Sequence, residues 1–245
     1  MKKTLKVLND KNFSYCSGCS HGVIHRLIAE VIEEKGLQNQ TIGICSTGGC
    51  STFMYDYFNI DFIESPTGKA PAVATGVKKV HPDKIVFTYQ GDGDLVGSGI
   101  NEVIHAAARS EKFTIIYVNN LISAGSGGQM SPTTLVGQIT STNPYGRSYD
   151  RSGRPIKISE LISNITGITY ISRVSVHTPK EVKKAKEYLH EAIDYQISGR
   201  GLSLIEFLSL CPTFWQMTPL EAKKWMTEKL VYEYPLGLIK KVVTK

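Results

Sequence analysis

The sequence predicts an α/β fold with a mostly parallel sheet and helices on both faces. Apolar runs of strand length alternate along the chain with longer segments of helical periodicity, and this alternation is typical of parallel strands joined by helices. No repeat, linker or low-complexity tract divides the 245 residues. We therefore expect a single domain over residues 1–245, with a C-terminal extension over about 212–245.

Five segments are predicted to be helices. In the first, Val23, Leu27 and Val31 recur near the helical period. Pro82 follows the second and ends it, whereas Pro179 opens the last, where a missing N–H costs no hydrogen bond. The predicted helices are 22–34, 70–80, 100–109, about 157–165 and 179–197.

Five apolar runs have the length of strands. Two other segments are predicted to be loops, because one is rich in Gly and Ser (123–134) and the other in Pro, Gly and Arg (143–155). The predicted strands are 41–46, 85–90, 113–120, 169–176 and 202–210.

The composition, with 41% hydrophobic and 20% charged residues, is that of an ordinary soluble globular protein. The formal net charge is +6, but the lysines are scattered and form no basic stripe interleaved with aromatic residues. We therefore expect no nucleic-acid partner. A mild positive field suits an acidic redox partner better.

The sequence contains no stretch near the ~20 apolar residues that a membrane-spanning helix needs. Its first ten residues, MKKTLKVLND, include lysines but lack the apolar run of a signal peptide. These observations predict a cytoplasmic protein with no membrane association.

A polar motif follows the predicted strand 85–90. Asp92 comes directly after this strand, and Asn120 stands at the end of the strand 113–120, so both side chains are expected at the carboxyl edge of the sheet, where ligands bind in such folds. Their oxygens are the hard ligands that Mg²⁺ prefers. Gly91 and Gly93 allow a phosphate to approach the backbone. The motif indicates a diphosphate held through Mg²⁺, and the alternative is a tight turn with Asp92 as a helix N-cap.

The five cysteines favour a metal or a cluster over disulfides if the compartment is reducing. Cys16 and Cys19 form a CxxC pair, which by itself fits zinc, redox chemistry, a cluster or no function. Zinc would require a second ligand pair, and the sequence has no second CxxC. Cys45, Cys50 and Cys211 are single, and the alternative for all five is an ordinary core position.

Several motifs together resemble one family. A Gly-Asp-Gly followed some thirty residues later by Asn-Asn is similar to the thiamine-diphosphate motif. With the other motifs, it resembles the beta subunits of 2-oxoacid:ferredoxin oxidoreductases, most closely those that act on branched-chain 2-oxo acids or 2-oxoglutarate. The motifs are CSGCSHG (16–22), TGKAPAVATGVK (67–78), TYQGDGDLVGSG (88–99), GGQMSPTT (127–134), NPYGR (143–147), RVSVHTPKEVKKAK (173–186) and SLIEFLSLCPTFW (203–215).

The resemblance implies a thiamine-diphosphate-binding fold and a set of site residues. Asp92, Asn120 and the carbonyl of Ile122 would bind Mg²⁺. A 4Fe-4S cluster would be bound by Cys16, Cys19, Cys50 and Cys211, leaving Cys45 as a core or strand residue. The further cofactor-binding residues implied are Gly91, Gly93, Asp94, Gly127 and Gly128.

The activity implied is oxidative decarboxylation of a 2-oxo acid to an acyl-CoA and CO₂, with electrons passed through the cluster to ferredoxin. The carboxylate that activates the cofactor would come from an alpha subunit, and gamma and delta subunits are further candidate partners. Thr67 and Lys69 are candidates for contacts with the substrate or, equally, for a helix-start turn. His21 is placed near the cluster or cofactor, or at a surface or N-cap position.

The chain also departs from the family pattern. It has Ser17 and Ser20 where the family usually has Pro and Gly, and Thr67-Gly68-Lys69 where it usually has His-Gly-Arg. Residues 121–129 lack the usual Tyr after Asn-Asn. Two alternatives therefore stay open: a thiamine-dependent lyase or synthase without electron transfer, and a non-catalytic subunit.

Overall fold

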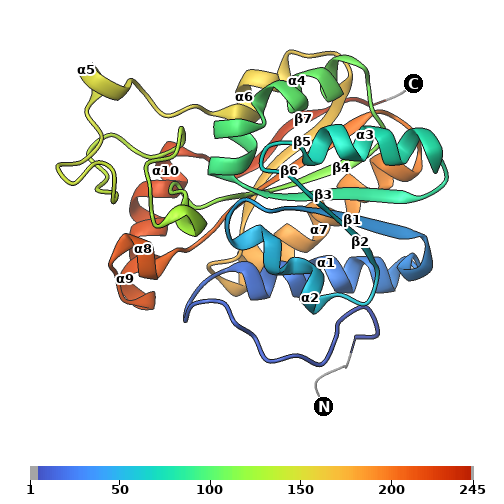
Figure 1. Cartoon of the computed structure of the whole chain (residues 1–245), viewed down its shortest axis with the longest axis horizontal. Coiled ribbons are helices and arrows are strands. Elements are labelled where there is room, and N and C mark those ends of the chain that lie inside the picture. Colours follow the sequence, from blue (N-terminus) through green and yellow to red (C-terminus); the bar gives the residue numbers. More distant parts are fainter. Residues whose placement is uncertain (1–4, 244–245) are drawn as a thin grey trace.

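Seven strands form one sheet in the computed structural model, which describes residues 5–243 (Figure 1). Their order across the sheet is β2-β1-β3-β4-β6-β5-β7. All neighbouring pairs are parallel except β5 and β7, which are antiparallel. The strands are β1 (Thr41–Ser46), β2 (Asp61–Ser65), β3 (Ile85–Gly91), β4 (Thr114–Asn119), β5 (Ile168–Ser175), β6 (Leu202–Leu208) and β7 (Gly237–Lys241).

The five predicted strands are confirmed within two residues at each end, and two edge strands were missed. β2 is mostly exposed and carries two acidic residues, and β7 ends in two lysines and begins at a glycine. Neither is an apolar run, because an edge strand buries little of its surface and blunts its free edge with charge. Edge strands of this kind leave a weak signal in the sequence.

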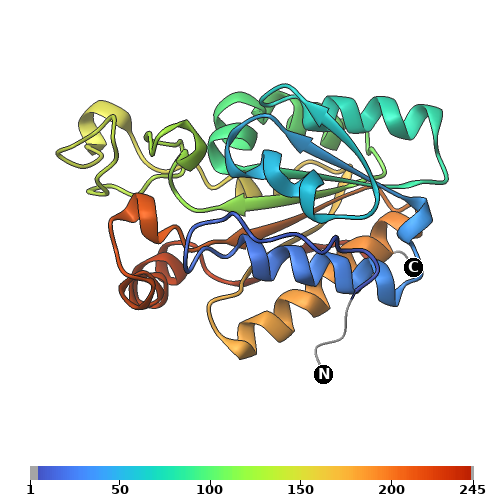
Figure 2. The same cartoon turned by 60° about the horizontal axis from the view of Figure 1, so that its bottom comes forward.

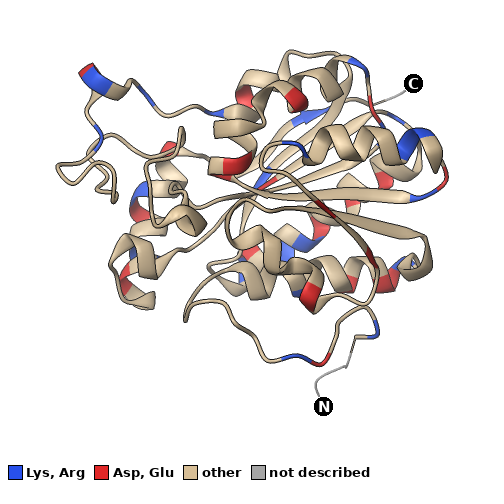
Figure 3. Ribbon diagram, in the orientation of Figure 1, with Lys and Arg blue, Asp and Glu red and all other residues tan. Residues whose placement is uncertain are grey.

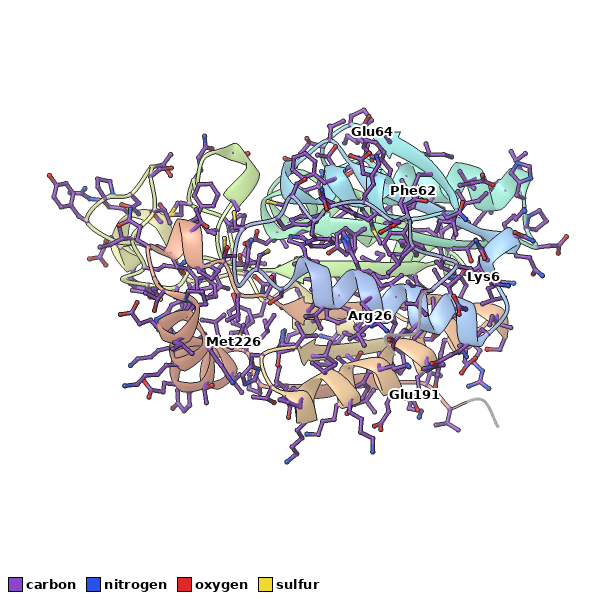
Figure 4. All side chains as sticks on the ribbon, turned by 90° about the horizontal axis from the view of Figure 1, so that it is seen from below. Lys6, Arg26, Phe62, Glu64, Glu191 and Met226 are labelled. Carbon is purple, nitrogen blue, oxygen red and sulfur yellow. The ribbon has the colours of Figure 1, made fainter. Side chains whose placement is uncertain are left out.

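Helices cover both faces of the sheet, as predicted (Figure 2). α1 and α7 pack against each other on one face, and α3, α4 and α6 lie on the other. Figure 4 labels Arg26 on α1 and Glu191 on α7, in the same helical layer. All five predicted helices are confirmed: α1 (His21–Glu34), α3 (Ala70–Val80), α4 (Ile100–Ala108), α6 (Ile158–Ser163) and α7 (Pro179–Ile197).

Each helical layer shares a hydrophobic core with the sheet. Neighbouring residues of one strand face opposite layers, as Ile116 packs with α1 and α7 while Ile115 packs with α3, α4 and α6. Both side chains are fully buried. The central strands are therefore apolar on both faces, which explains why they were recognisable as continuous apolar runs.

The segment after β6 forms a third, smaller core on the loop that follows β4. Cys211, Trp215, Met226 and Tyr234 pack there against Ile122. The short helices of this segment are α8 (Pro212–Trp215), α9 (Pro219–Trp225) and α10 (Val231–Glu233), with a wider turn at Met226–Leu230. The sequence predicted only an extension here, and its last two residues lie outside the described ones. Another short helix, α2 (Met54–Tyr57), follows β1, and α5 (Tyr149–Ser152) interrupts the predicted loop 143–155.

The positions of Lys and Arg are scattered along the ribbon of the described chain and interspersed with those of Asp and Glu (Figure 3). Several lysines form ion pairs with a nearby carboxylate, as Lys186 does with Glu30 and Glu34. Among residues 5–243, no helix combines the length and apolarity needed to cross a bilayer.

The topology places a crevice at the carboxyl edge of the sheet. From β1 the chain moves outward to β2 and then returns across β1 to β3, so the connections leave the neighbouring strands β1 and β3 in opposite directions. Open α/β sheets bind their ligands at such a reversal, outside the carboxyl ends of the strands.

Candidate active site

A cavity of about 330 Å³ lies at this reversal. Its walls come from the segments that follow β1, β2, β3 and β4. Glycine has no side chain, so it lets the backbone approach a ligand closely. The glycines that line it are Gly48, Gly49, Gly91, Gly93, Gly97 and Gly125.

Two of these glycines are required by close packing, and a third is not. A Cβ on Gly125 would lie 2.0 Å from the Cα of Gly49, and one on Gly93 would lie 2.5 Å from Oγ of Ser123. A Cβ on Gly91 would meet no atom within 4 Å. Gly91 is therefore dispensable for the packing of the chain itself, and its missing side chain leaves open space in the cavity wall.

Three oxygen atoms converge on one side of the cavity. The amide oxygen of Asn120, as placed, lies 3.1 Å from Oδ1 of Asp92 and 2.6 Å from the carbonyl oxygen of Ile122, and turning the amide would let its nitrogen donate to both. As placed, it accepts only a long hydrogen bond, 3.3 Å, from the backbone N–H of Ile122. The Asp92 carboxylate, the Asn120 side chain and the Ile122 carbonyl offer oxygen ligands of the kind that a divalent metal ion prefers.

Asp92 is almost fully buried and has only neutral donors among the described residues. Its carboxylate accepts hydrogen bonds from Oγ1 of Thr133 (2.5 Å) and the backbone N–H of Gly93 (2.9 Å). Burial raises the pKa of Asp92 to about 6, against the effect of these bonds. The alternative N-cap position is also observed, because Asp92 precedes the wide turn Gly93–Ser98. A bound cation would relieve the cost of the buried charge.

Asp94, predicted to contact the cofactor, has a structural task as well. Its carboxylate accepts hydrogen bonds from the backbone N–H of Gly68 and, at 3.1 Å, from the Gln90 side chain. It thereby fixes the turn that carries Thr67, which lines the cavity. Lys69 does not line the cavity; its ammonium group is half-exposed and pairs with Glu102.

The predicted cofactor residues Gly127 and Gly128 also lie outside the cavity lining. They have φ values of +83° and +74°, and a Cβ on Gly128 would lie 2.6 Å from Cδ1 of Phe214. Their glycine identity follows from a left-handed turn and close packing against α8.

A second cavity, of about 90 Å³, collects four cysteines from three distant segments. Among the residues that the structure describes, its lining holds Cys16, Cys19, Cys50 and Cys211 with His21, Asn120 and aromatic and small side chains, and no Asp, Glu, Lys or Arg. Burial raises the pKa of Cys19 to about 11 and raises that of Cys211 further. Cys45 is buried in the core, away from this cavity, as predicted.

This set of four cysteines fits an iron–sulfur cluster better than a single ion. Among the described residues, no group of three or more His, Cys, Asp or Glu side chains is close enough to hold one metal ion. A cubane is wider than an ion, so its four thiolates stand further apart. Thiols that bound iron would give up their protons, and the iron would offset the cost of burying the thiolates.

The two cavities share part of one wall, formed by His21, Cys50, Asn120 and Ala124. His21 is buried, and its Nδ1 lies 2.5 Å from the hydroxyl of Tyr89. Burial lowers the pKa of His21 to about 4, so the ring is neutral at physiological pH. The prediction that His21 lies near the cluster or cofactor agrees with this position, whereas the alternative of a surface position is wrong.

Sequence reasoning missed Tyr15 and Thr133. The Tyr15 ring stacks on His21 with 4.7 Å between centroids, and its hydroxyl donates to the carbonyl of Cys50. Thr133 reaches Asp92 from 41 residues away. A lone Tyr before a CxxC and a Thr within a loop motif carry no spacing signal, because only the tertiary fold brings them to the site.

Comparison with known proteins agrees with this geometry. The family described as thiamine pyrophosphate enzyme, C-terminal TPP binding domain, matches residues 47–207. The 2-oxoglutarate synthase subunit KorB of Methanothermobacter marburgensis is 32% identical over 222 residues, which cover 89% of this chain and 74% of that subunit. The chain belongs to the beta subunits of 2-oxoacid:ferredoxin oxidoreductases. The resemblance found in the sequence is thereby confirmed.

Within the 2-oxoacid:ferredoxin oxidoreductases, the ketoisovalerate oxidoreductase subunit VorA of Methanothermobacter thermautotrophicus is 40% identical over 222 residues. The match covers 91% of this chain and 46% of VorA, so the chain spans about half the length of that relative.

The predicted α/β fold is also confirmed by a solved structure, that of 2-oxoglutarate:ferredoxin oxidoreductase from Magnetococcus marinus with 2-oxoglutarate, coenzyme A and succinyl-CoA bound. It superposes with a TM-score of 0.82 at 22% identity, over 98% of this chain and 84% of that chain.

Proposed function

We propose that this chain binds thiamine diphosphate, Mg²⁺ and a 4Fe-4S cluster, and that with an alpha subunit it oxidatively decarboxylates a 2-oxo acid to an acyl-CoA and CO₂, passing electrons to ferredoxin. The observation that carries the proposal is the wall shared by the glycine-lined cavity and the four-cysteine cavity. A thiamine-dependent lyase has no use for the second cavity. A branched-chain 2-oxo acid is the favoured substrate, because the ketoisovalerate relatives are 40–41% identical and the 2-oxoglutarate relatives 31–32%.

Different residues of the cofactor cavity would bind the metal ion and the diphosphate. Asp92, Asn120 and the carbonyl of Ile122 would hold Mg²⁺, and the metal would neutralise the diphosphate. Gly91 leaves room for the phosphate oxygens next to the backbone, and Gly93 lines the same cavity. Thiamine diphosphate, when bound, supplies the nucleophilic carbon and the electron sink that decarboxylation requires.

The residues between the two cavities would keep the cofactor and the cluster close together and exclude water from the space between them. His21, Cys50 and Ala124 fill the shared wall with buried or partly buried groups. The neutral His21 ring places no fixed charge there. A 4Fe-4S cluster held by the four thiolates would supply one-electron transfer, and Cys16, which is exposed, would lie on its solvent side.

The chain needs a carboxylate from a partner. Asp92 and Asp94 are the acidic residues among the described lining of the cofactor cavity, and each is already engaged, Asp92 with Thr133 and the metal position and Asp94 with Gly68. We therefore expect the isolated chain to bind the cofactor weakly and to turn over no 2-oxo acid. Adding the alpha subunit should strengthen cofactor binding and allow turnover of the 2-oxo acid. Turnover by the isolated chain, measured as viologen reduction, would refute the shared site.

Gly91→Ala tests whether the open space in the wall belongs to the cofactor. The added Cβ meets no protein atom within 4 Å and φ is not positive, so thermal unfolding of the cofactor-free protein should not change. The methyl group should intrude on the diphosphate and weaken thiamine diphosphate binding ~10-fold or more, a loss of ~1.4 kcal/mol. Gly76→Ala, on the exposed side of α3 with equally open space, is the matched control. Equal affinities in both variants would contradict the placement.

The activity itself is tested by a substrate panel. The chain is co-expressed with its neighbouring genes, purified without oxygen, and assayed for viologen or ferredoxin reduction with coenzyme A and a series of 2-oxo acids. The proposal predicts reduction with 2-ketoisovalerate above the others. Release of CO₂ without electron transfer would favour the lyase, and bound cofactors without turnover would favour the non-catalytic subunit.

A further inference from the structure

Arg173, in the interior strand β5, is the largest fully buried side chain among the described residues. Its Nε donates to Oε2 of Glu206 at 2.9 Å. Its two terminal nitrogens donate to the two carboxylate oxygens of Glu160 at 2.8 and 2.6 Å. Arg173 and Glu206 are each 1% exposed, so this ion pair is withdrawn from water.

One chain of contacts runs from Arg173 to the loop that carries the proposed metal ligands. Oε1 of Glu206 accepts a hydrogen bond of 2.8 Å from the side chain of Asn119, and Oδ1 of Asn119 accepts one of 3.3 Å from the backbone N–H of Leu121. Leu121 has φ of +61°, a left-handed conformation that a leucine rarely adopts. It stands between Asn120, whose side-chain amide lies 3.1 Å from Oδ1 of Asp92, and Ile122, whose carbonyl oxygen lies 2.6 Å from the same amide. The contacts from Asn119 help to hold this strained turn.

A second chain of contacts runs from Arg173 to Asp92. The guanidinium lies 5.2 Å from the centroid of the Tyr234 ring. The Tyr234 hydroxyl donates to the carbonyl of Thr133 at 3.0 Å, and Oγ1 of Thr133 donates to Oδ2 of Asp92. Arg173 is therefore connected through buried polar groups to both halves of the motif, the Gly-Asp-Gly and the Asn-Asn.

Stability alone does not account for this arrangement. Desolvating a buried ion pair costs about as much as the pair returns, and apolar residues of similar size often stabilise a protein equally well. A fully connected polar network does, however, fix a single geometry. Outer groups that orient metal ligands are known to matter for metal affinity.

We propose that Arg173 is a positioning residue that aligns the two halves of the metal site, through Glu206 and Asn119 on one side and through Tyr234 and Thr133 on the other. This inference rests on the proposed binding of Mg²⁺ and thiamine diphosphate. Arg173 itself contacts neither ligand position. Without it, Asp92 and the oxygens of Asn120 and Ile122 lose their alignment while the sheet persists.

Gln196 provides a control of similar burial and bonding. It is 4% exposed, and its side chain bonds to the backbone N–H and carbonyl of Val86 and to the hydroxyl of Thr114. Val86 and Thr114 lie near the amino ends of β3 and β4, the opposite ends of the strands that carry Asp92 and Asn120. Gln196→Leu should therefore destabilise the fold without disturbing the metal loop.

The test compares Arg173→Met, Tyr234→Phe and Gln196→Leu in the complex with its partner subunits. Affinity for Mn²⁺ in the presence of thiamine diphosphate is measured by EPR, and thermal unfolding is measured without either ligand. We expect Arg173→Met to weaken Mn²⁺ binding ~10- to 100-fold. Tyr234→Phe, which removes only the hydroxyl that reaches Thr133, should weaken it less and leave unfolding nearly unchanged. Gln196→Leu should lower the unfolding temperature and keep the affinity.

Equal loss of affinity in Arg173→Met and Gln196→Leu, or unchanged affinity in Arg173→Met, would overturn the inference. If Arg173→Met does not fold, Tyr234→Phe and Glu206→Gln decide instead, and unchanged Mn²⁺ affinity in both overturns it. Failure of the wild-type complex to bind Mn²⁺ with thiamine diphosphate is a different result, because it refutes the proposed function itself.

Discussion

Replacing Asp92 with alanine is expected to abolish thiamine diphosphate binding and turnover while the chain stays folded. The substitution removes the charged member of the three-oxygen set, so the affinity for Mg²⁺ with the cofactor should fall by more than ~100-fold, beyond the effect of an outer-shell change. Burial raises the pKa of Asp92 to about 6 from an ordinary 3.8. The folded state therefore holds more protons than the unfolded state between these values, and the ionised carboxylate lowers stability above pH 6.

The raised pKa of Asp92 also leads to an expectation for the stability of the Asp92→Ala variant. At neutral pH the cofactor-free variant should be about as stable as wild type, because the lost hydrogen bonds and the lost desolvation cost oppose each other. Equilibrium dialysis measures bound thiamine diphosphate, and thermal unfolding measures stability. Asp83→Ala, at an exposed position, is the control. Retained cofactor binding by Asp92→Ala would remove this carboxylate from the metal site.

The second large effect is expected at the cysteines. Cys211→Ser should lose the cluster, with the iron and sulfide content and the visible absorbance falling together, and viologen reduction should disappear. Cys45→Ser is the matched control, since Cys45 is fully buried but lies outside the four-cysteine cavity. It should keep its iron and lose only stability, by ~1–3 kcal/mol for a buried hydroxyl. Equal iron loss in both variants, or none in Cys211→Ser, would refute the assignment of ligands.

The parts of the fold that the sequence predicted are those that local physics determines. α7 has a Thr N-cap and Pro179 at its start, and its apolar face repeats over nineteen residues. β3 and β4 are buried on both faces and read as apolar runs. β2 and β7 lie at the sheet edges, where burial no longer constrains the residues, and they left no such signal.

The candidate site likewise contains residues that local sequence could predict and residues that it could not. Asp92 and Asn120 were predictable because each follows a strand, and the topology brings strand ends together. The positions of Lys69, Gly127 and Gly128 depend on side-chain pairing and loop packing, and none of them lines the cofactor cavity. The pairing of Arg173 with Glu206 could not be predicted for a different reason. The sequence shows a charged residue within an apolar strand, but only the tertiary structure shows which residue it pairs with.

Decarboxylation at one cavity should reduce a cluster bound in the other, and this reduction can be followed without any external electron acceptor. A 2-oxo acid is added to the anaerobic complex, and the visible iron–sulfur absorbance and the EPR signal are followed. We expect the absorbance to bleach in the wild type and to stay unchanged in Asp92→Ala with its cluster intact. Release of CO₂ by the wild type with no change in a cluster that remains reducible by dithionite would contradict this expectation.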